Sequence, residues 1–466
     1  MVLVPAVESM VRRFRPALSR QAAFEWFVLV LFAMLLRLDL AGVTSFVRVL
    51  GLSPLEYRNL LHFFHSTATS ARELSRIWLD IAREQAPLVK LRGRLVAILD
   101  SIKVAKEGRK MPGVKWQHQE SENNTKPEFI RGHYWGALAL LMQKGAQFFG
   151  LPIRLQIQDG IKRSPSEKLS LVDKMASMIG ETLTVLTYLV GDAYFVSRSF
   201  ILAVVLQGHH FIGRVRSTSV GYTPAPEPTS GKRRRGRPRT KGEKIVLREL
   251  FEDPDLFSLA DARVYVELRE VRYFVIDLFW NRLPFLVRFV LTIYANGARR
   301  IFLSTDTHLI AEEIISAYSW RFKIEVSFKV MVRLIGAFAY HFWLKIMKPA
   351  GRKAKDLYLH RASPALRQVV ARKIEAYERF VTVAAIALGI LQLLALRHAA
   401  FIRNLFPIWL RTYPKSSYPT ELVARSAIQQ ELYTIPRRSR ASLLLSKILG
   451  AKRRARSAPQ CLRISA

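Results

Sequence analysis

The stretch YSWRFKIEVSFK, Tyr318 to Lys329, places four polar side chains on one face of a predicted helix. At 3.6 residues per turn, Arg321, Glu325 and Lys329 lie roughly 300°, 340° and 20° around the axis from Tyr318, in a sector about 80° wide. One carboxylate is therefore set among two cations and a phenol. Two interpretations are open. The face is either a solvated ladder of i,i+4 ion pairs worth roughly 0.2–0.5 kcal/mol each, or a site where Glu325 holds a metal ion and the cations hold phosphate.

The composition predicts a partner that carries many negative charges. Among 466 residues, 73 are Lys or Arg and 36 are Asp or Glu, so the formal net charge is +37 at pH 7. Hydrophobic residues make up 50% of the chain, which is enough to bury sizeable cores and excludes a disordered polycation. Nucleic acid is the leading partner for such a chain, and an anionic membrane surface is the alternative.

Two apolar runs bear on the membrane alternative. FEWFVLVLFAMLL, Phe24 to Leu36, and FVTVAAIALGILQLLAL, Phe380 to Leu396, are both shorter than the ~20 residues that a membrane span needs. Glu25 lies in the first run and Gln392 in the second. We expect two core helices and no membrane partner. The single cysteine, Cys461, cannot form an intramolecular disulfide, which suits the reducing cytoplasm.

The N-terminal region is predicted to be helical. In VTSFVRVLGLSPLEYRNLLHFF, 43–64, two apolar-periodic segments are separated by Gly51 and Ser53, and Ser53 suits an N-cap before Pro54 at the first helical position. The outline resembles a helix-turn-helix, and an ordinary helical hairpin explains the same spacing. We interpret residues 1–88 as a helical region that binds DNA ends.

The predicted secondary structure changes from helices to strands after residue 90. RLVAILD, YWGALALLM and FFGLPIRLQI predict an antiparallel meander, and a helix at 166–183 follows. A buried strand then ends near Asp192, and Ser197 or Ser199 can cap the next helix. Strands return between 210 and 304, before a long helix that Asp306 or Thr307 can cap and that carries Tyr318 to Lys329. The order predicts a mixed α/β fold.

These patterns divide the chain into five regions. We predict the helical region at 1–88, an α/β core in two parts at 89–209 and 305–345, a β-rich insertion at 210–304, and a helical region with a basic tail at 346–466.

Three carboxylates are candidates for one site. Asp100 and Asp192 each end an apolar, strand-like run, and Glu325 lies on the predicted helix. Each alone is more often an ordinary polar residue than a catalyst. Three converging carboxylates, however, are what two Mg²⁺ ions need when the ions also keep waters and a substrate phosphate. Two such ions can activate the attacking oxygen and stabilise the departing one in phosphodiester cleavage.

The sequence resembles the insertion-sequence DDE transposases that carry a Tyr-x2-Arg-x3-Glu signature. Tyr318, Arg321 and Glu325 match that signature, and Lys329 stands where the family commonly has a lysine. AILDSIK resembles the first aspartate block and GDAYF the second. The family's next lysine position is Val332 here, with Arg333 beside it.

The resemblance spans roughly residues 40–400, and it implies an RNase H-like catalytic core with Asp100, Asp192 and Glu325 as the metal ligands. Mg²⁺ is the expected cofactor, two ions per site, with Mn²⁺ as a substitute. The implied activity is cleavage of double-stranded DNA at terminal inverted repeats and joining of 3′-hydroxyls to target DNA, by a dimer or larger assembly in the bacterial cytoplasm at the nucleoid. An RNase H-like nuclease without strand transfer and an inactive DNA-binding remnant are the alternatives.

A second basic segment lies in the β-rich insertion. GKRRRGRPRTKGEK, 231–244, contains an Arg-Gly-Arg-Pro core that resembles an AT-hook, in which arginines enter a narrow minor groove. A loop that grips phosphates without sequence preference is equally consistent with it. In both interpretations these cations contact DNA: Arg233, Arg234, Arg235, Arg237, Arg239 and Lys241.

Overall fold

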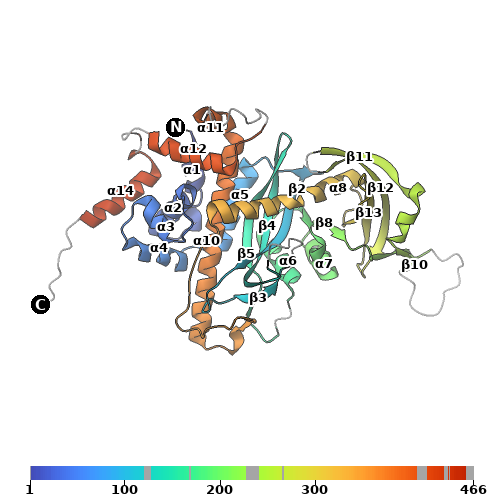
Figure 1. The fold of residues 1–466 in the computed structure, drawn as a ribbon, viewed down its shortest axis with the longest axis horizontal. Coiled ribbons are helices and arrows are strands. Elements are labelled where there is room, and N and C mark those ends of the chain that lie inside the picture. Colours follow the sequence, from blue (N-terminus) through green and yellow to red (C-terminus); the bar gives the residue numbers. More distant parts are fainter. Residues whose placement is uncertain are drawn as a thin grey trace.

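The protein is a mixed α/β structure with one large sheet running through the middle of the molecule (Figure 1). The computed structural model describes residues 2–119, 127–166, 169–226, 241–264, 267–406, 417–434, 439 and 441–457. The strands of the large sheet are β1 (Lys90–Leu91), β2 (Arg94–Ala105), β3 (Lys115–His118), β4 (Phe129–Lys144), β5 (Gln147–Ile157), β7 (Thr187–Gly191), β8 (His210–Val215), β9 (Val220–Pro224), β10 (Lys241–Val246), β11 (Ser258–Val264), β12 (Glu267–Trp280), β13 (Leu286–Tyr294) and β14 (Arg299–Ser304). A second, two-stranded sheet pairs β6 (Ile161–Lys162) with β15 (Leu357–Tyr358).

Five strands form the centre of the large sheet, in the order β5-β4-β2-β7-β8. β2, β4 and β5 are antiparallel, so the predicted meander is confirmed. β7 runs parallel to β2, and β8 runs parallel to β7. Parallel neighbours need crossover connections, which α6 (Leu171–Thr182) and α7 (Arg198–Leu206) supply here. The Ser197 hydroxyl caps α7 by accepting a hydrogen bond from the Phe200 amide, so Ser197 is the cap of the two that were predicted.

The strands after β8 continue the same sheet in the order β8-β14-β13-β12-β9-β10, all antiparallel. The predicted strands of this block are present, with two differences. β9 was not predicted, because its Gly and Pro content masks the strand pattern. The alternating run RVYVELRE, 263–270, also predicts a single strand, but β11 ends at Val264 and β12 begins at Glu267, and the two strands pair with each other.

Helices from both ends of the chain pack together beside the sheet (Figure 1). The N-terminal helices are α1 (Leu3–Arg12), α2 (Gln21–Leu36), α3 (Thr44–Leu50), α4 (Glu56–His65) and α5 (Ala71–Gln85), and the C-terminal helices are α10 (Pro364–Arg397), α11 (Ala399–Leu405), α12 (Glu421–Thr434) and α14 (Leu444–Ser457). Both apolar runs are buried helices, α2 and α10, as predicted. By length and composition α10 could cross a membrane, and all of its most apolar 18-residue window is buried inside the protein.

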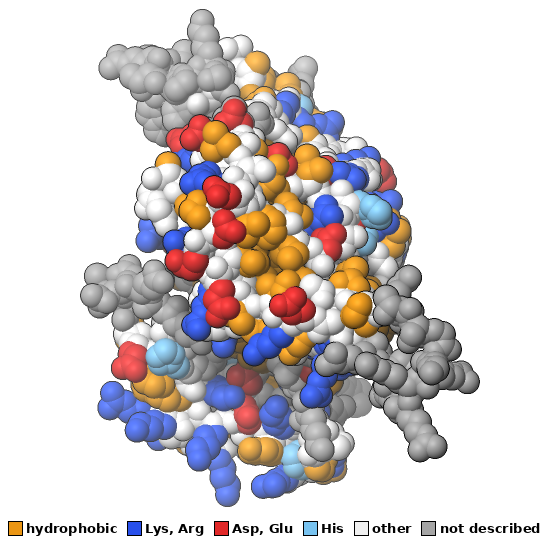
Figure 2. All heavy atoms as spheres, turned by 90° about the vertical axis from the view of Figure 1, so that its right-hand side faces the viewer, with side chains coloured by type: hydrophobic (Ala, Val, Ile, Leu, Met, Phe, Trp, Pro, Cys, Tyr) orange, Lys and Arg blue, Asp and Glu red, His pale blue; other side chains and the backbone are white. Residues whose placement is uncertain are grey.

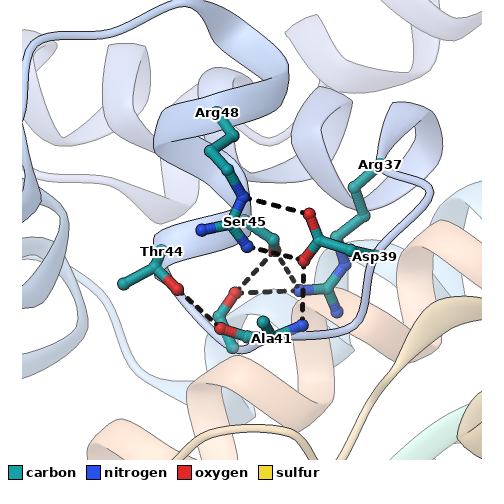
Figure 3. Close-up of polar contacts among 7 residues, drawn as sticks. Arg37, Asp39, Ala41, Thr44, Ser45 and Arg48 are labelled. Atoms are coloured by element: carbon teal, nitrogen blue, oxygen red, sulfur yellow. Dashed lines mark hydrogen bonds and ion pairs between the residues drawn. The ribbon is translucent and has the colours of Figure 1, made fainter.

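The connection from α2 to α3 is held by a buried arginine (Figure 3). Arg37 is 0% exposed, and its guanidinium donates to the Gly42 carbonyl and the Ser45 hydroxyl. The same guanidinium donates to the backbone carbonyls of Ile335 and Gly336, which lie almost 300 residues further along the chain. The N-terminal helices are therefore joined to the segment just after Glu325 and Lys329.

The α3–α4 pair differs in one detail from the prediction. Gly51 ends α3 in the left-handed conformation, with φ of 58°, which glycine adopts without strain. α4 begins at Glu56 with Leu55 as its N-cap, so the prediction of Ser53 as the N-cap was wrong. The Ser53 hydroxyl instead accepts from the Leu55 amide in the turn that precedes the helix.

The helix that carries the motif is interrupted, contrary to the prediction of one long helix. α8 (Ala311–Ser319) begins four residues after Thr307, and the Asp306 carboxylate accepts from the His308 amide in the preceding turn. A 3₁₀ turn, η5 (Trp320–Phe322), separates α8 from α9 (Lys323–Val330), and a π-helical turn, η6 (Met331–Ile335), follows. Trp320 is 9% exposed and stacks on Phe148 with ring centroids 4.8 Å apart. The motif therefore spans three short helical segments.

Candidate active site

Asp100 lies in the middle of a strand. The prediction that it ends its strand was wrong, because β2 continues to Ala105 and Asp100 is paired with Ala137 of β4. The strand continues through the polar residues after Asp100 because the 16-residue β4 supplies hydrogen-bond partners over the whole length. The Asp100 side chain is 14% exposed, so this carboxylate is largely removed from water.

Asp192 directly follows β7, as predicted, at the carboxyl end of a strand that is parallel to both of its neighbours. Its carboxylate accepts a hydrogen bond of 3.0 Å from the Tyr194 amide and caps the 3₁₀ turn η2 (Ala193–Phe195). In sheets with parallel strands, the carboxyl ends of the strands are where binding sites form.

Arg321 joins the first and the third predicted carboxylates. Its Nη1 atom is 2.9 Å from an Asp100 oxygen, and its Nη2 atom is 2.8 Å from a Glu325 oxygen. The arginine side chain is 19% exposed, whereas Glu325 is 54% exposed. The i,i+4 pair expected from the spacing is therefore present, and a second pair connects it to a residue 221 positions away. Within the described chain, Glu325 pairs with Arg321 and not with Lys329.

The three carboxylates act on one another electrostatically. Burial raises the pKa of Asp100 to about 6, although the positive charge of Arg321 lowers it in part. A hydrogen bond of 2.7 Å from the Ser101 amide to the Asp100 carboxylate also lowers this pKa, and the negative charges of Asp192 and Glu325 raise it. Asp192 and Glu325 therefore lie near Asp100, and the fold brings the three predicted residues into one region.

The donor chemistry of this region suits Mg²⁺, because hard divalent cations take carboxylate oxygens. The present arrangement is different from a ready metal site. In the part of the chain that is described, no group of three His, Cys, Asp or Glu side chains is placed to hold a metal ion. The guanidinium of Arg321 is the cation that Asp100 and Glu325 share, so metal binding remains a prediction that requires this bridge to open.

Tyr318 lies beside the bridge. Its ring packs on Phe302 with centroids 4.9 Å apart, and burial raises the pKa of its hydroxyl group. The charges of Arg321 and Arg214 lower that pKa in part. Sequence reasoning missed Arg214, which alternates with Arg216 in the run GRVR and so projects to one side of the strand. That alternation was the available signal.

The remaining predicted DNA-binding residues lie on the surface or outside the described residues. Lys329 and Arg333 are exposed, and Arg333 lies in the π-helical turn beside Val332, which is 45% exposed. Lys241 begins β10, and its ammonium group is 4.8 Å from the centroid of the Tyr222 ring. The AT-hook-like arginines fall outside the described residues: Arg233, Arg234, Arg235, Arg237 and Arg239.

Comparisons with known proteins give a distant likeness to solved structures. No family model matches the chain, and no curated protein matches it. A solved structure of the piggyBac transposase synaptic complex with hairpin DNA aligns with 92% of this chain and 81% of its own, at 11% identity and a TM-score of 0.32. This TM-score is too low to establish a common fold, so the function proposed below is argued from the residues alone.

Proposed function

We propose that this protein is a DNA transposase of the DDE class that cuts DNA at the ends of an insertion sequence and joins the 3′-hydroxyls to target DNA. The supporting observation is the bridge from Arg321 to Asp100 and Glu325, with Asp192 near enough to raise the pKa of Asp100. A shared arginine and three carboxylates from distant parts of the chain are the side chains that phosphodiester chemistry needs. The spacing of Tyr318, Arg321 and Glu325 resembles the signature of this class and supports the proposal.

We further propose that the five central strands form an RNase H-like core. In support, three antiparallel strands, β5, β4 and β2, are followed by two parallel strands, β7 and β8, in one sheet with α6 and α7 as crossovers. This order places Asp100 on the middle strand and Asp192 at the end of its parallel neighbour.

Asp100, Asp192 and Glu325 would hold two Mg²⁺ ions, with Mn²⁺ as a substitute. When bound, such ions activate the attacking oxygen and stabilise charge on the phosphate. Arg321 must release Asp100 and Glu325 before their oxygens are free. Its guanidinium can then hold a DNA phosphate through two parallel hydrogen bonds, and Lys329, exposed one turn after Glu325, adds a second cation.

The proposed partners follow from the same class. They are double-stranded DNA with terminal inverted repeats and a target DNA, bound by a dimer or larger assembly in the bacterial cytoplasm. The net charge of +37 supports a polyanionic partner, and the helical N-terminal region is the proposed contact with the DNA ends.

The test compares three carboxylate variants with a matched control. Asp100→Asn, Asp192→Asn and Glu325→Gln should each abolish Mg²⁺-dependent nicking of a plasmid that carries the DNA flanking the coding region, and should leave DNA binding in EDTA intact. Glu84→Gln is the control, because Glu84 is 58% exposed and pairs with Arg13 of the N-terminal region. Nicking by Glu325→Gln at the wild-type rate would refute the assignment.

A second experiment separates transposition from simple cleavage. Pre-cleaved DNA ends and a supercoiled target plasmid are incubated with the wild-type protein and Mg²⁺. Joined products identify a transposase, whereas nicked plasmid without joined products identifies a nuclease. No cleavage of any substrate by the wild-type protein would identify an inactive DNA-binding remnant.

A further inference from the structure

A cavity lined by arginines opens beside Asp192. It has a volume of about 800 Å³ and lies between the end of β8, the start of β14 and the 3₁₀ turn η3 (Glu249–Glu252). Ala193, the residue after Asp192, forms part of its wall, and five arginines line it: Arg214, Arg216, Arg248, Arg299 and Arg300. A smaller cavity shares Arg300 with it and is also lined by Tyr318 and by Arg321 of the carboxylate bridge.

The strand register explains why these arginines adjoin the candidate active site. Gly191 of β7 is paired with Gly213 of β8, so Asp192 and Arg214 are the next residues along two parallel neighbours. Arg214 is paired with Phe302 of β14, and directly opposite residues project to the same face of a sheet. Alternate residues of one strand also share a face, so Arg300 lies on the side of Phe302. Tyr318 packs against that same Phe302 ring.

The charges in this cavity are unequally neutralised. Arg299 is paired with Glu252 at 2.9 Å and lies over the Phe251 ring. Among the residues that are described, Arg214, Arg216 and Arg300 form no ion pair with a carboxylate, and Arg300 lies over the Tyr294 ring at 5.1 Å. Arg214 and Arg216 are exposed. Guanidinium groups that lack an internal counter-ion and line a concave surface attract phosphate.

The outer face of the insertion has a different character. Figure 2 shows hydrophobic side chains through the middle of this face, with Asp, Glu, Lys and Arg side chains among and around them. This face is mixed in charge, whereas five arginines and two glutamates line the cavity.

We propose that Arg214, Arg216 and Arg300 form a track that holds the phosphodiester backbone of the DNA strand on one side of the phosphate to be cut. The track begins next to Asp192 and leads away from the carboxylate bridge into the insertion. This inference rests on the proposed function for the identity of the ligand as DNA. It adds a binding site that fixes the direction in which the strand leaves the active site.

The first experiment measures the salt dependence of DNA binding in EDTA, where no cleavage takes place. The probe is a fluorescein-labelled 30-base-pair duplex from the DNA flanking the coding region. The slope of log affinity against log salt is negative, and the double variant Arg214→Gln with Arg216→Gln should reduce its magnitude by about two, because each phosphate contact contributes roughly 0.9. The matched control is Arg269→Gln with Arg272→Gln, two exposed arginines of β12 in the same insertion, which should leave the slope unchanged. Equal slopes for the two double variants would overturn the proposal.

The second experiment locates the contact on the DNA. Cys461 is the only cysteine, so Cys461→Ser with Arg216→Cys gives a single thiol inside the cavity. Duplexes that carry an activated mixed disulfide on one defined phosphate should exchange with this thiol, releasing the small leaving thiol and forming a protein–DNA disulfide, at a few consecutive positions of one strand. Arg272→Cys in the same background is the control. No disulfide at any position, or the same positions for both thiols, would overturn the track.

These outcomes are distinguishable from a failure of the proposed function. If the wild-type protein cuts no DNA with Mg²⁺ but the slope and the disulfide positions agree with the track, the proposed catalysis fails and the track stands. If the wild-type protein cuts DNA while both measurements match their controls, the track fails and the catalytic assignment stands.

Discussion

Replacing Glu378 by Gln should stabilise the protein at pH 8.5 and leave its stability nearly unchanged at pH 5. Glu378 lies on α10, its residue is 9% exposed, and its carboxylate accepts a hydrogen bond of 3.0 Å from the Ile157 amide. Burial raises the pKa of this carboxyl group from 4.5 to about 7, although the charge of Arg154 lowers it in part.

The sign and size of the effect follow from this pKa. Between pH 4.5 and 7 the folded protein keeps a proton that the unfolded chain releases, so the stability that Glu378 contributes is lost as the pH rises through this window. Above pH 7 the buried charge costs about 3 kcal/mol, at 1.36 kcal/mol for each pKa unit. Glutamine cannot ionise, and its amide oxygen can still accept from Ile157. The stabilisation of Glu378→Gln should be smaller than this figure, because the substitution also removes the negative charge that Arg154 attracts.

Urea unfolding at pH 5 and pH 8.5 measures the effect. We expect the free energy of unfolding of Glu378→Gln to exceed that of the wild type by about 1–3 kcal/mol at pH 8.5, with a difference near zero at pH 5. Glu267→Gln is the control, because Glu267 is 70% exposed and its partner Arg269 is 52% exposed. A difference for Glu378→Gln that is the same at both pH values would refute the reasoning.

Three further perturbations test other parts of the structure. Arg321→Ala should lower the salt slope of DNA binding by about 0.9, and Arg321→Lys should restore part of the affinity because it keeps the charge and loses the paired geometry; equal affinities of the two variants would contradict this role. Gly389→Ala should destabilise the protein by roughly 1–3 kcal/mol in urea unfolding, because the new methyl group would lie 2.2 Å from the Trp78 ring. The control is Gly450→Ala on α14, whose new methyl group meets nothing within 4 Å and which should stabilise the protein by up to about 1 kcal/mol. His133 is fully buried with its Nε2 atom 2.9 Å from the Pro112 carbonyl, and burial lowers its pKa to about 4, so stability should fall as the pH drops from 6.5 to 4. In His133→Gln the urea concentration at the unfolding midpoint should change less with pH over that range. A pH dependence equal to that of the wild type would show that other groups cause the fall in stability.

The local part of the candidate site could be predicted from spacing. Arg321 and Glu325 are four residues apart, and the predicted ion pair forms even though a 3₁₀ turn interrupts the helix, because one turn is enough to bring the two side chains together. The pair between Arg321 and Asp100 could not be derived from spacing, since only the packing of α9 on β2 and β5 brings the two elements together.

The extent of the elements was less predictable than their type. The strand through Asp100 continues over Ser101 and Lys103 because β4 provides a long partner. The length of β4 cannot be predicted from the residues of β2 alone. The helix was predicted to start at Asp306 or Thr307 because both residues are good caps, yet Asp306 caps only a turn and also accepts a hydrogen bond from the Tyr188 hydroxyl. Tertiary partners decided both boundaries.

The buried guanidinium of Arg37 sets a limit on how the protein can be divided. It supplies donors to the Ile335 and Gly336 carbonyls at the end of the motif segment, and Arg425 of α12 donates both to the Arg37 carbonyl and to the Leu334 carbonyl. A fragment cut at the predicted boundaries, 89–345, would leave these carbonyls without their donors and would expose the surfaces that α2 and α10 cover. The segment that follows Arg321 and Glu325 is thus held by residues from both ends of the chain, so a fragment that lacks either end is expected to be insoluble.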